Sequence, residues 1–127
     1  MEKQCFVDTH VLVWLYNRDL DYFSAKAKQQ LDQSKLWVSP ICLLELDYLY
    51  EIKRIKKKGW PIYQDLQREV DLEIAEDPYL RIVEVASQIS QTRDPFDRLL
   101  VAHAKLRGLP IVSKDRFLKV IYSACMW

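Results

Sequence analysis

The feature that most constrains the fold is an acidic residue placed just after a short buried strand, near both ends of the chain. At the start, the apolar run Cys5-Phe6-Val7 ends at Asp8, and a helical pattern begins at Thr9. Near the C-terminus, the apolar run Leu109–Ser113 is followed by Asp115. Ligands of open α/β sheets bind outside the carboxyl ends of the parallel strands. Both acids are therefore candidate site residues, although helix capping explains Asp8 equally well.

Strands and helices are expected to alternate along the chain. Apolar runs predict strands at 5–7, 36–38 and 109–113, a last strand within 122–127 and a weaker one at 72–75. Helices are predicted from residue 9 and over 25–32, 41–54, 63–70, 79–90 and 95–107. This alternation predicts an α/β fold, a three-layer α/β/α sandwich around a mostly parallel central sheet of four to five short strands. A length of 127 residues indicates one domain, 1–127.

The composition excludes several classes of protein. Half of the residues are hydrophobic and only 2 are glycine, which excludes disordered and fibrous chains. The formal net charge is +1, so binding to nucleic acid must depend on a local patch. The three cysteines are far apart and lie in apolar segments, which favours buried thiols in a reducing compartment. With no signal peptide pattern and no apolar run of about 20 residues, we expect a cytoplasmic protein that does not contact membranes.

Glu45 interrupts the apolar side of the helix predicted from Ile41 to about Arg54. The charged residues Asp47, Glu51 and Arg54 share a solvated face, whereas the neighbours of Glu45 are Cys42, Leu49 and Ile52. Burying an unpaired carboxylate costs several kcal/mol, so Glu45 needs an arginine, a hydrogen-bond network or a metal ion as a partner. The alternative is a glutamate at the rim of the apolar stripe.

Two more acids open the helix that begins near residue 95. Asp94 is a good N-cap, Pro95 suits the first helical position, and Asp97 falls in the first turn, where the helix dipole favours a negative charge. Capping explains both acids, but the same dipole would hold the charge of Asp97 if it faced other carboxylates. Farther along this helix, His103 lies on the apolar face and is expected to be packed or to lie at an interface rather than to bind a metal.

Four of these acids converge if the sheet is parallel. Asp8 and Asp115 then lie on one edge, which Glu45 and Asp97 can also reach. Carboxylates held together repel one another and raise their pKa values, and Mg²⁺ or Mn²⁺, which prefer oxygen ligands, relieve that repulsion. Such ions suit phosphodiester hydrolysis.

The chain also resembles a known family, the PIN domain, and most closely its VapC-type branch, the ribonuclease toxins of bacterial toxin–antitoxin pairs. The resemblance spans nearly the whole chain and is carried by Val7-Asp8-Thr9-His10, the apolar helix with Glu45, the segment Asp94 to Ala104, and the segment Leu109 to Asp115. It implies an α/β/α sandwich and an Mg²⁺-dependent endoribonuclease. It also implies a homodimer and an antitoxin partner whose tail fills the active-site groove.

The resemblance assigns roles to individual residues. It implies that Asp8, Glu45, Asp97 and Asp115 are the catalytic and metal-binding quartet. Ser113, two positions before the last acid, is implied to steady a carboxylate or a water. Asp94 and Thr9 are expected to support the quartet.

The family resemblance assigns no role to a basic run at residues 53–58. The cations of this run are Lys53, Arg54, Lys56, Lys57 and Lys58. One interpretation is a solvated helix end, where lysines also suit the helix dipole. The other is a nucleic-acid-binding patch with Trp60 or Tyr63 available for stacking on bases.

The leading hypothesis is thus an Mg²⁺- or Mn²⁺-dependent endoribonuclease that hydrolyses RNA phosphodiester bonds as the toxin of a type II toxin–antitoxin pair. The alternative is a non-catalytic PIN-fold module that binds RNA or protein. A phosphatase or nucleotide-binding domain is disfavoured, because there is no glycine-rich phosphate loop and no D-x-D motif after the first strand. The residues do not exclude DNA as a substrate.

Overall fold

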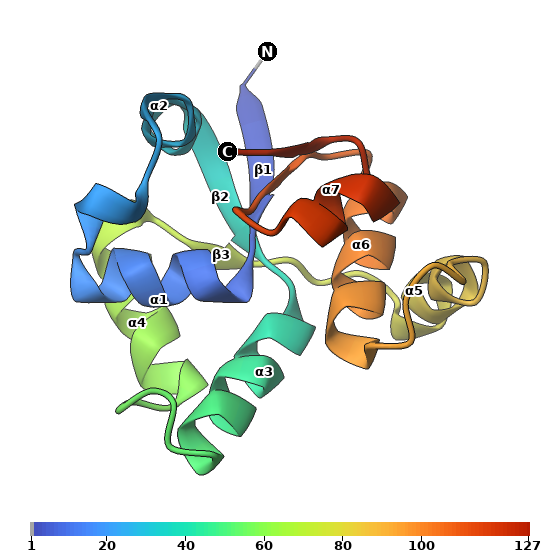
Figure 1. Cartoon of the computed structure of the whole chain (residues 1–127), viewed down its shortest axis with the longest axis horizontal. Coiled ribbons are helices and arrows are strands. Elements are labelled where there is room, and N and C mark those ends of the chain that lie inside the picture. Colours follow the sequence, from blue (N-terminus) through green and yellow to red (C-terminus); the bar gives the residue numbers. More distant parts are fainter. Residues whose placement is uncertain (1) are drawn as a thin grey trace.

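The computed structural model describes residues 2–127, and the five strands in this part of the chain form one parallel sheet (Figure 1). The sheet order is β3-β2-β1-β4-β5, so β1 is central. The strands are β1 Lys3–Val7, β2 Ser34–Val38, β3 Glu73–Ile74, β4 Ile111–Val112 and β5 Cys125–Met126. The predicted α/β class, the parallel sheet and the edge position of the last strand are confirmed.

The helices cover both faces of this sheet. They are α1 Thr9–Asn17, α2 Ala25–Gln33, α3 Pro40–Glu51, α4 Gly59–Val70, α5 Tyr79–Ala86, α6 Pro95–Arg107 and α7 Arg116–Ile121, with a short 3₁₀ turn η1 at Leu20–Tyr22. Crossovers between parallel strands are right-handed. Because the chain moves across the sheet in one direction up to β3 and in the other direction after it, the helices before and after β3 lie on opposite faces. Figure 1 shows α1, α2 and α4 on one side of the sheet and α5, α6 and α7 on the other, with α3 near the carboxyl ends of the strands.

The order of the strands reverses at the position in the sheet where β1 and β4 lie side by side. The chain moves outward from β1 to β2 and β3, then returns to the opposite side of β1 to add β4 and β5. Ligands of open α/β sheets bind at such a topological switch point. The segments that follow β1 and β4 are therefore the natural location of a site.

The core is apolar apart from a hydrogen-bonded network around His103 and the buried polar side chains of Asp8, Thr9, Thr92 and Ser113. Fully buried side chains on the three inner strands include Phe6, Val7, Val38 and Ile111. The cysteines Cys5, Cys42 and Cys125 are buried free thiols, as predicted.

His103 is the centre of the buried polar network and is packed, as predicted. Its Nε2 lies 2.8 Å from Asp77 Oδ2, and its Nδ1 lies 2.8 Å from Ser39 Oγ. Burial lowers the pKa of His103, which favours the neutral ring. Because an ionised carboxylate only accepts, Nε2–H donates to Asp77 and the Ser39 hydroxyl donates to Nδ1. Ser39 therefore occupies the N-cap position of α3 without capping it by its side chain.

The predicted end of α3 is wrong, and so is the interpretation of the basic run as a helix end. The helix stops at Glu51 because Lys53 adopts a left-handed conformation with φ 64°. The Lys53 N–H then donates to the Tyr50 carbonyl at 3.0 Å, and the Arg54 N–H donates to the Leu49 carbonyl at 2.8 Å. These two bonds form the Schellman arrangement that closes helices. The basic residues consequently lie in a loop between α3 and α4.

α4 begins four residues earlier than predicted, at Gly59. The carboxylate of Asp47 accepts a hydrogen bond from the Gly59 N–H at 2.8 Å, which satisfies a free amide of the first turn. Asp47 is half-buried, and so it does not belong to the solvated face predicted for α3. Gly59 itself packs closely on α3, because an added Cβ would lie 2.5 Å from the Leu43 carbonyl oxygen.

α5 is shorter than predicted. It ends at Ala86 rather than near Ser90, and its buried residues are Ile82 and Ala86. The apolar pattern of this segment predicts that Leu80, Val83 and Ala86 or Ser87 face inward; the position of Ala86 is confirmed, whereas Leu80 is 71% exposed. Ile82 and Ala86 are four residues apart and lie on the same face, so this short helix packs on the core through a narrow stripe.

Candidate active site

Asp8 and Ser113 meet at the topological switch point. Parallel pairing sets Val7 beside Val112, so the residues that follow each strand are neighbours. The Ser113 hydroxyl donates to Asp8 Oδ2 at 2.6 Å, and the Thr9 N–H donates to Asp8 Oδ1 at 2.7 Å. Asp8 is only 8% exposed, and this desolvation raises its pKa. The two hydrogen bonds lower the pKa but do not outweigh the desolvation. Both carboxylate oxygens are thus held by the protein.

Glu45 reaches the same edge of the sheet from α3. Its Oε1 accepts a hydrogen bond from the fully buried hydroxyl of Thr9 at 2.5 Å. Desolvation raises the pKa of Glu45, and the nearby charge of Asp8 raises it further. The hydrogen-bond partner that Glu45 was predicted to need is therefore the Thr9 hydroxyl. The Glu45 carboxylate is half-buried and lies at the rim of the apolar stripe.

Asp97 is the most perturbed of the accessible acids. Its pKa is raised to about 7, first by desolvation and then by the negative charges of Asp94, Asp8, Asp115 and Glu45. Since Coulomb interactions weaken with distance, Asp8, Asp115 and Glu45 lie near enough to Asp97 for their charges to act on its carboxyl group. Asp94 caps α6 as predicted, accepting from the Phe96 N–H at 2.9 Å and from the Asp97 N–H at 3.3 Å.

Asp115 closes the site on the side of β4. Its Oδ1 accepts from the Phe117 N–H at 2.8 Å and from the Leu118 N–H at 3.2 Å, which caps α7. Its own N–H donates to Ser113 Oγ at 3.1 Å. The hydroxyl of Ser113 therefore links Asp8 and Asp115.

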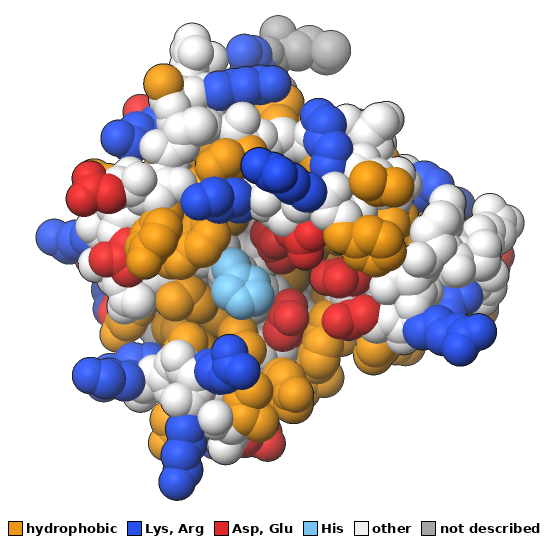
Figure 2. Space-filling view, in the orientation of Figure 1, with side chains coloured by type: hydrophobic (Ala, Val, Ile, Leu, Met, Phe, Trp, Pro, Cys, Tyr) orange, Lys and Arg blue, Asp and Glu red, His pale blue; other side chains and the backbone are white. Residues whose placement is uncertain are grey.

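The acids form a patch at the centre of one face of the molecule. Figure 2 shows red side chains gathered in a shallow hollow, with lysine and arginine side chains above and below it. No ion pair within residues 2–127 joins a lysine or arginine to any member of the quartet. Within the described chain, the negative charge of the patch is therefore not offset by a lysine or arginine ion pair.

Comparison with protein families decides the identity of this arrangement. The model of the PIN domain matches residues 5–123. The chain belongs to the PIN domain family. Proteins of this family are generally nucleases that use divalent metal ions.

Two solved structures share the fold of this PIN domain. One is a chain of the VapBC2 complex from Rickettsia felis, solved bound to a DNA fragment from its promoter, with a TM-score of 0.64, 20% identity and 92% of each chain covered. The other is PAE2754 from Pyrobaculum aerophilum, with a TM-score of 0.61 and 21% identity, covering 99% of this chain and 91% of that one. No curated protein sequence matches this chain.

The candidate site of this PIN domain has the types of side chain that bind a divalent cation, but these side chains are not spaced closely enough to coordinate one together. All four members of the quartet offer carboxylate oxygens, the ligands that Mg²⁺ and Mn²⁺ prefer. The raised pKa values and the lack of cationic partners favour an added positive charge. Within residues 2–127, however, no three His, Cys, Asp or Glu side chains are spaced closely enough to hold one ion. Asp8 and Glu45 instead accept hydrogen bonds from Thr9 and Ser113, and Asp115 accepts them from the first turn of α7.

Sequence reasoning missed the residues that wall the hollow beside Asp8 and Asp115. A cavity of about 240 Å³ is lined by these two acids together with His10, Trp14 and Lys114. The charge of His10 lowers the pKa of both Asp8 and Glu45, which places it near them. The position of His10 two residues after Asp8, at the start of a helix, was the available signal.

The basic run lies apart from the acids that the structure brings together. Asp94, Thr9 and Ser113 each form a hydrogen bond with a member of the quartet, whereas 53–58 adjoins the far end of α1. In residues 2–127 no helix is long and apolar enough to cross a membrane.

Proposed function

We propose that this PIN domain is an Mg²⁺- or Mn²⁺-dependent endoribonuclease that hydrolyses phosphodiester bonds in RNA. The observation that carries the proposal is the arrangement of acids at the switch point of the sheet: the Ser113 hydroxyl links Asp8 and Asp115, and the Thr9 hydroxyl holds Glu45. The charges of these acids also raise the pKa of Asp97. An uncompensated cluster of this kind is typical of functional sites rather than of surface capping.

Asp8, Glu45, Asp97 and Asp115 are the residues that would hold the cation. A bound divalent ion supplies positive charge that offsets the carboxylates and stabilises the charge developing on the attacked phosphate. The protein contributes orientation. Ser113 holds Asp8, and Thr9 holds Glu45 at the distances given above. Asp97 sits at the N-terminus of α6, whose dipole stabilises its ionised form.

We further propose that the protein is a type II toxin with an antitoxin partner, acting in the cytoplasm as a homodimer. Support comes from the family motifs in the sequence and from the fold shared with a chain of the VapBC2 complex. The finding of a small DNA-binding protein encoded next to this chain would strengthen this part of the proposal.

The test of activity is cleavage of RNA by the purified chain with Mg²⁺ or Mn²⁺. Cleavage is expected to stop with EDTA and to fall at least 100-fold in Asp8→Asn and Asp97→Asn, because each removes a ligand charge. Asp32→Asn, an exposed acid of α2, is the matched control and should cut normally. Normal cleavage by both site variants, or none by the native chain with any divalent ion, contradicts the proposal.

A non-catalytic PIN-fold module that binds RNA or protein is the alternative. It is favoured by one observation, the lack of three closely spaced metal ligands in residues 2–127. Thermal unfolding separates the two functions, because a ligand that binds the native state raises its midpoint. A rise with millimolar Mg²⁺ or Mn²⁺ that is absent in Asp97→Asn supports the nuclease, whereas no rise supports the module.

A further inference from the structure

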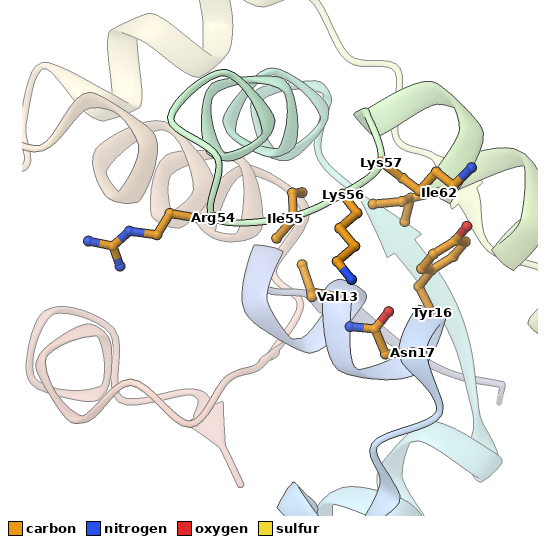
Figure 3. Close-up of a pocket in the computed structure, with 8 residues that line it drawn as sticks. All are labelled: Val13, Tyr16, Asn17, Arg54, Ile55, Lys56, Lys57 and Ile62. Atoms are coloured by element: carbon orange, nitrogen blue, oxygen red, sulfur yellow. The ribbon is translucent and has the colours of Figure 1, made fainter.

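A cavity of about 300 Å³ lies between α1 and the loop that joins α3 to α4 (Figure 3). From α1, the side chains of Val13, Tyr16 and Asn17 point toward the loop, and Lys56 extends from the loop toward α1. The whole lining consists of Val13, Tyr16, Asn17, Arg54, Ile55, Lys56, Lys57 and Ile62. The cavity therefore lies where the basic run meets the helix that Asp8 caps.

The lining combines three kinds of surface. Val13, Ile55 and Ile62 are apolar, Tyr16 adds an aromatic ring, and Asn17 adds an amide that both donates and accepts hydrogen bonds. The charged members are Arg54, Lys56 and Lys57, and no carboxylate is among the lining residues. Such a site suits a ligand with a flat apolar part, polar edges and a negative charge.

The cations of the loop are available to a ligand. No ion pair within residues 2–127 involves Arg54, Lys56 or Lys57, and all three side chains are exposed. Figure 3 shows the guanidinium of Arg54 directed away from the other lining side chains and the Lys57 side chain running outward beside Ile62, so Lys56 is the cation that extends toward α1.

The loop is also held in place at its centre and at both ends. Lys53 and Arg54 close α3 through backbone hydrogen bonds of 3.0 and 2.8 Å. Ile55 packs against the core, and Gly59 is tied to Asp47 at 2.8 Å. A site that is already ordered loses little conformational entropy when it binds a ligand.

α1 connects this cavity to the acidic site. Asp8 caps the first turn of the helix, and Asn17 is its last residue. At 1.5 Å per residue, the two positions lie roughly 13 Å apart along the axis. A stacked nucleic acid strand rises about 3.4 Å per nucleotide, so this distance corresponds to about four nucleotides.

We propose that this cavity binds one unpaired nucleotide of an RNA strand whose backbone crosses the acidic site. The base occupies the space between Tyr16 and the apolar wall, its edge pairs with Asn17, and the adjoining phosphates contact Lys56 and Lys57. Single-stranded RNA is recognised in this way, by aromatic stacking and by hydrogen bonds to base edges. An acidic peptide would use the cations but not the apolar wall and ring. The proposal rests on the proposed ribonuclease function and makes the cavity a determinant of where RNA is cut.

Binding of a fluorescein-labelled, 12-nucleotide RNA of mixed sequence tests the proposal, measured by fluorescence anisotropy in EDTA so that nothing is cleaved. The double variant Lys56→Ala/Lys57→Ala is expected to bind at least fivefold more weakly. Its plot of log affinity against log salt should be shallower by about 1.4, since two phosphate contacts are lost. The matched control Lys28→Ala/Lys105→Ala removes two exposed lysines of α2 and α6 and should bind like the native chain.

Val13→Phe tests the cavity without a change of charge. It narrows the space for a base, so binding should weaken about fivefold or more with an unchanged salt slope. The thermal midpoint checks that the variant folds. If it does not fold, Asn17→Trp blocks the same cavity from an exposed position.

Three results overturn the assignment. Equal affinities of the Lys56/Lys57 variant and its control show that RNA does not use the loop. Native affinity in a folded cavity-blocking variant shows that no base enters. If the binding of a 12-residue oligoglutamate depends on Lys56 and Lys57 and the binding of RNA does not, the loop is an acidic-peptide site. Cleavage is scored separately: a chain that binds as expected but cuts no RNA retains the cavity assignment and loses the ribonuclease function.

Discussion

Ser113 Oγ donates a hydrogen bond of 2.6 Å to Asp8 Oδ2 although 105 positions separate the two residues in the chain. The same oxygen accepts the Asp115 N–H at 3.1 Å. A single hydroxyl therefore sets the relative positions of the two acids that end β1 and β4. Ser113 is a positioning residue for the proposed metal site, because it acts through these acids.

Replacing Ser113 by alanine should weaken Mn²⁺ binding by about tenfold, since groups that orient metal ligands typically contribute that much or more. Calorimetric titration with Mn²⁺ measures the change. Ser113→Thr keeps the hydroxyl and should restore most of the affinity, whereas Ser123→Ala, at an exposed position, should have no effect. Equal Mn²⁺ affinities for Ser113→Ala and the native protein would show that Ser113 does not orient the ligands.

Asp97 should make the metal-free protein less stable as the pH rises. Its folded pKa of about 7 lies above its ordinary value of 3.8, so the native state retains a proton that the unfolded chain has released. The stability that this proton provides is complete below about pH 4 and is lost as the pH rises to 7. In EDTA, Asp97→Asn should gain about 1 kcal/mol over the native protein between pH 5 and 8, a modest value because solvent screens a half-exposed carboxylate.

Urea denaturation of both proteins at the two pH values measures this difference. Asp32→Asn, which removes an exposed acid, should follow the native protein at both. The burial of His103 lowers its pKa and so acts in the opposite direction, reducing stability as the pH falls through about 6.5. Because both proteins retain His103, the comparison cancels its contribution, and a gain that does not change with pH would exclude the interpretation of Asp97.

Ser39→Ala should destabilise the protein by about 1–3 kcal/mol, because it leaves the buried Nδ1 of His103 without its hydrogen-bond donor. The loss would not arise from capping, since the Ser39 side chain makes no bond to the first turn of α3. Chemical denaturation measures the free energy of unfolding, with Ser90→Ala, an exposed position, as the control. A loss no larger than that of the control would mean that the network contributes little.

The two glycines should respond differently to substitution. Gly59→Asn is expected to cost about 1–3 kcal/mol or more, because any Cβ would lie 2.5 Å from the Leu43 carbonyl oxygen. Gly108 has φ 69°, and apart from its immediate chain neighbours no atom lies within 4 Å of the position that a Cβ would take, so asparagine, which tolerates this conformation, should be accepted with little loss. Urea midpoints of the two variants test the contrast, and similar losses at both positions would contradict it.

Much of the fold could be predicted because its signals are local. The helices predicted over 25–32 and 95–107 have local start and stop signals, because Ser24 and Asp94 cap their N-termini and Gly108 ends the second one. The alternation of short apolar strands likewise depends on residues within one strand. Some errors occur where a tertiary contact overrides such signals. α4 starts early because the Asp47 carboxylate accepts a hydrogen bond from the Gly59 N–H. Ser39 is a favoured N-cap residue by sequence, yet it does not cap α3 because His103 accepts its hydroxyl hydrogen.

The sequence by itself determined the chemistry of the candidate site: carboxylates at two strand ends, another on an apolar stripe and another in the first turn of α6. Only the tertiary structure decided their arrangement, because the sheet order places β4 beside β1 and so brings Ser113 to Asp8. It also placed the basic run in a loop beside α1, where the left-handed Lys53 ends α3. Periodicity describes which side of an element is apolar, but it carries no information about which elements become neighbours.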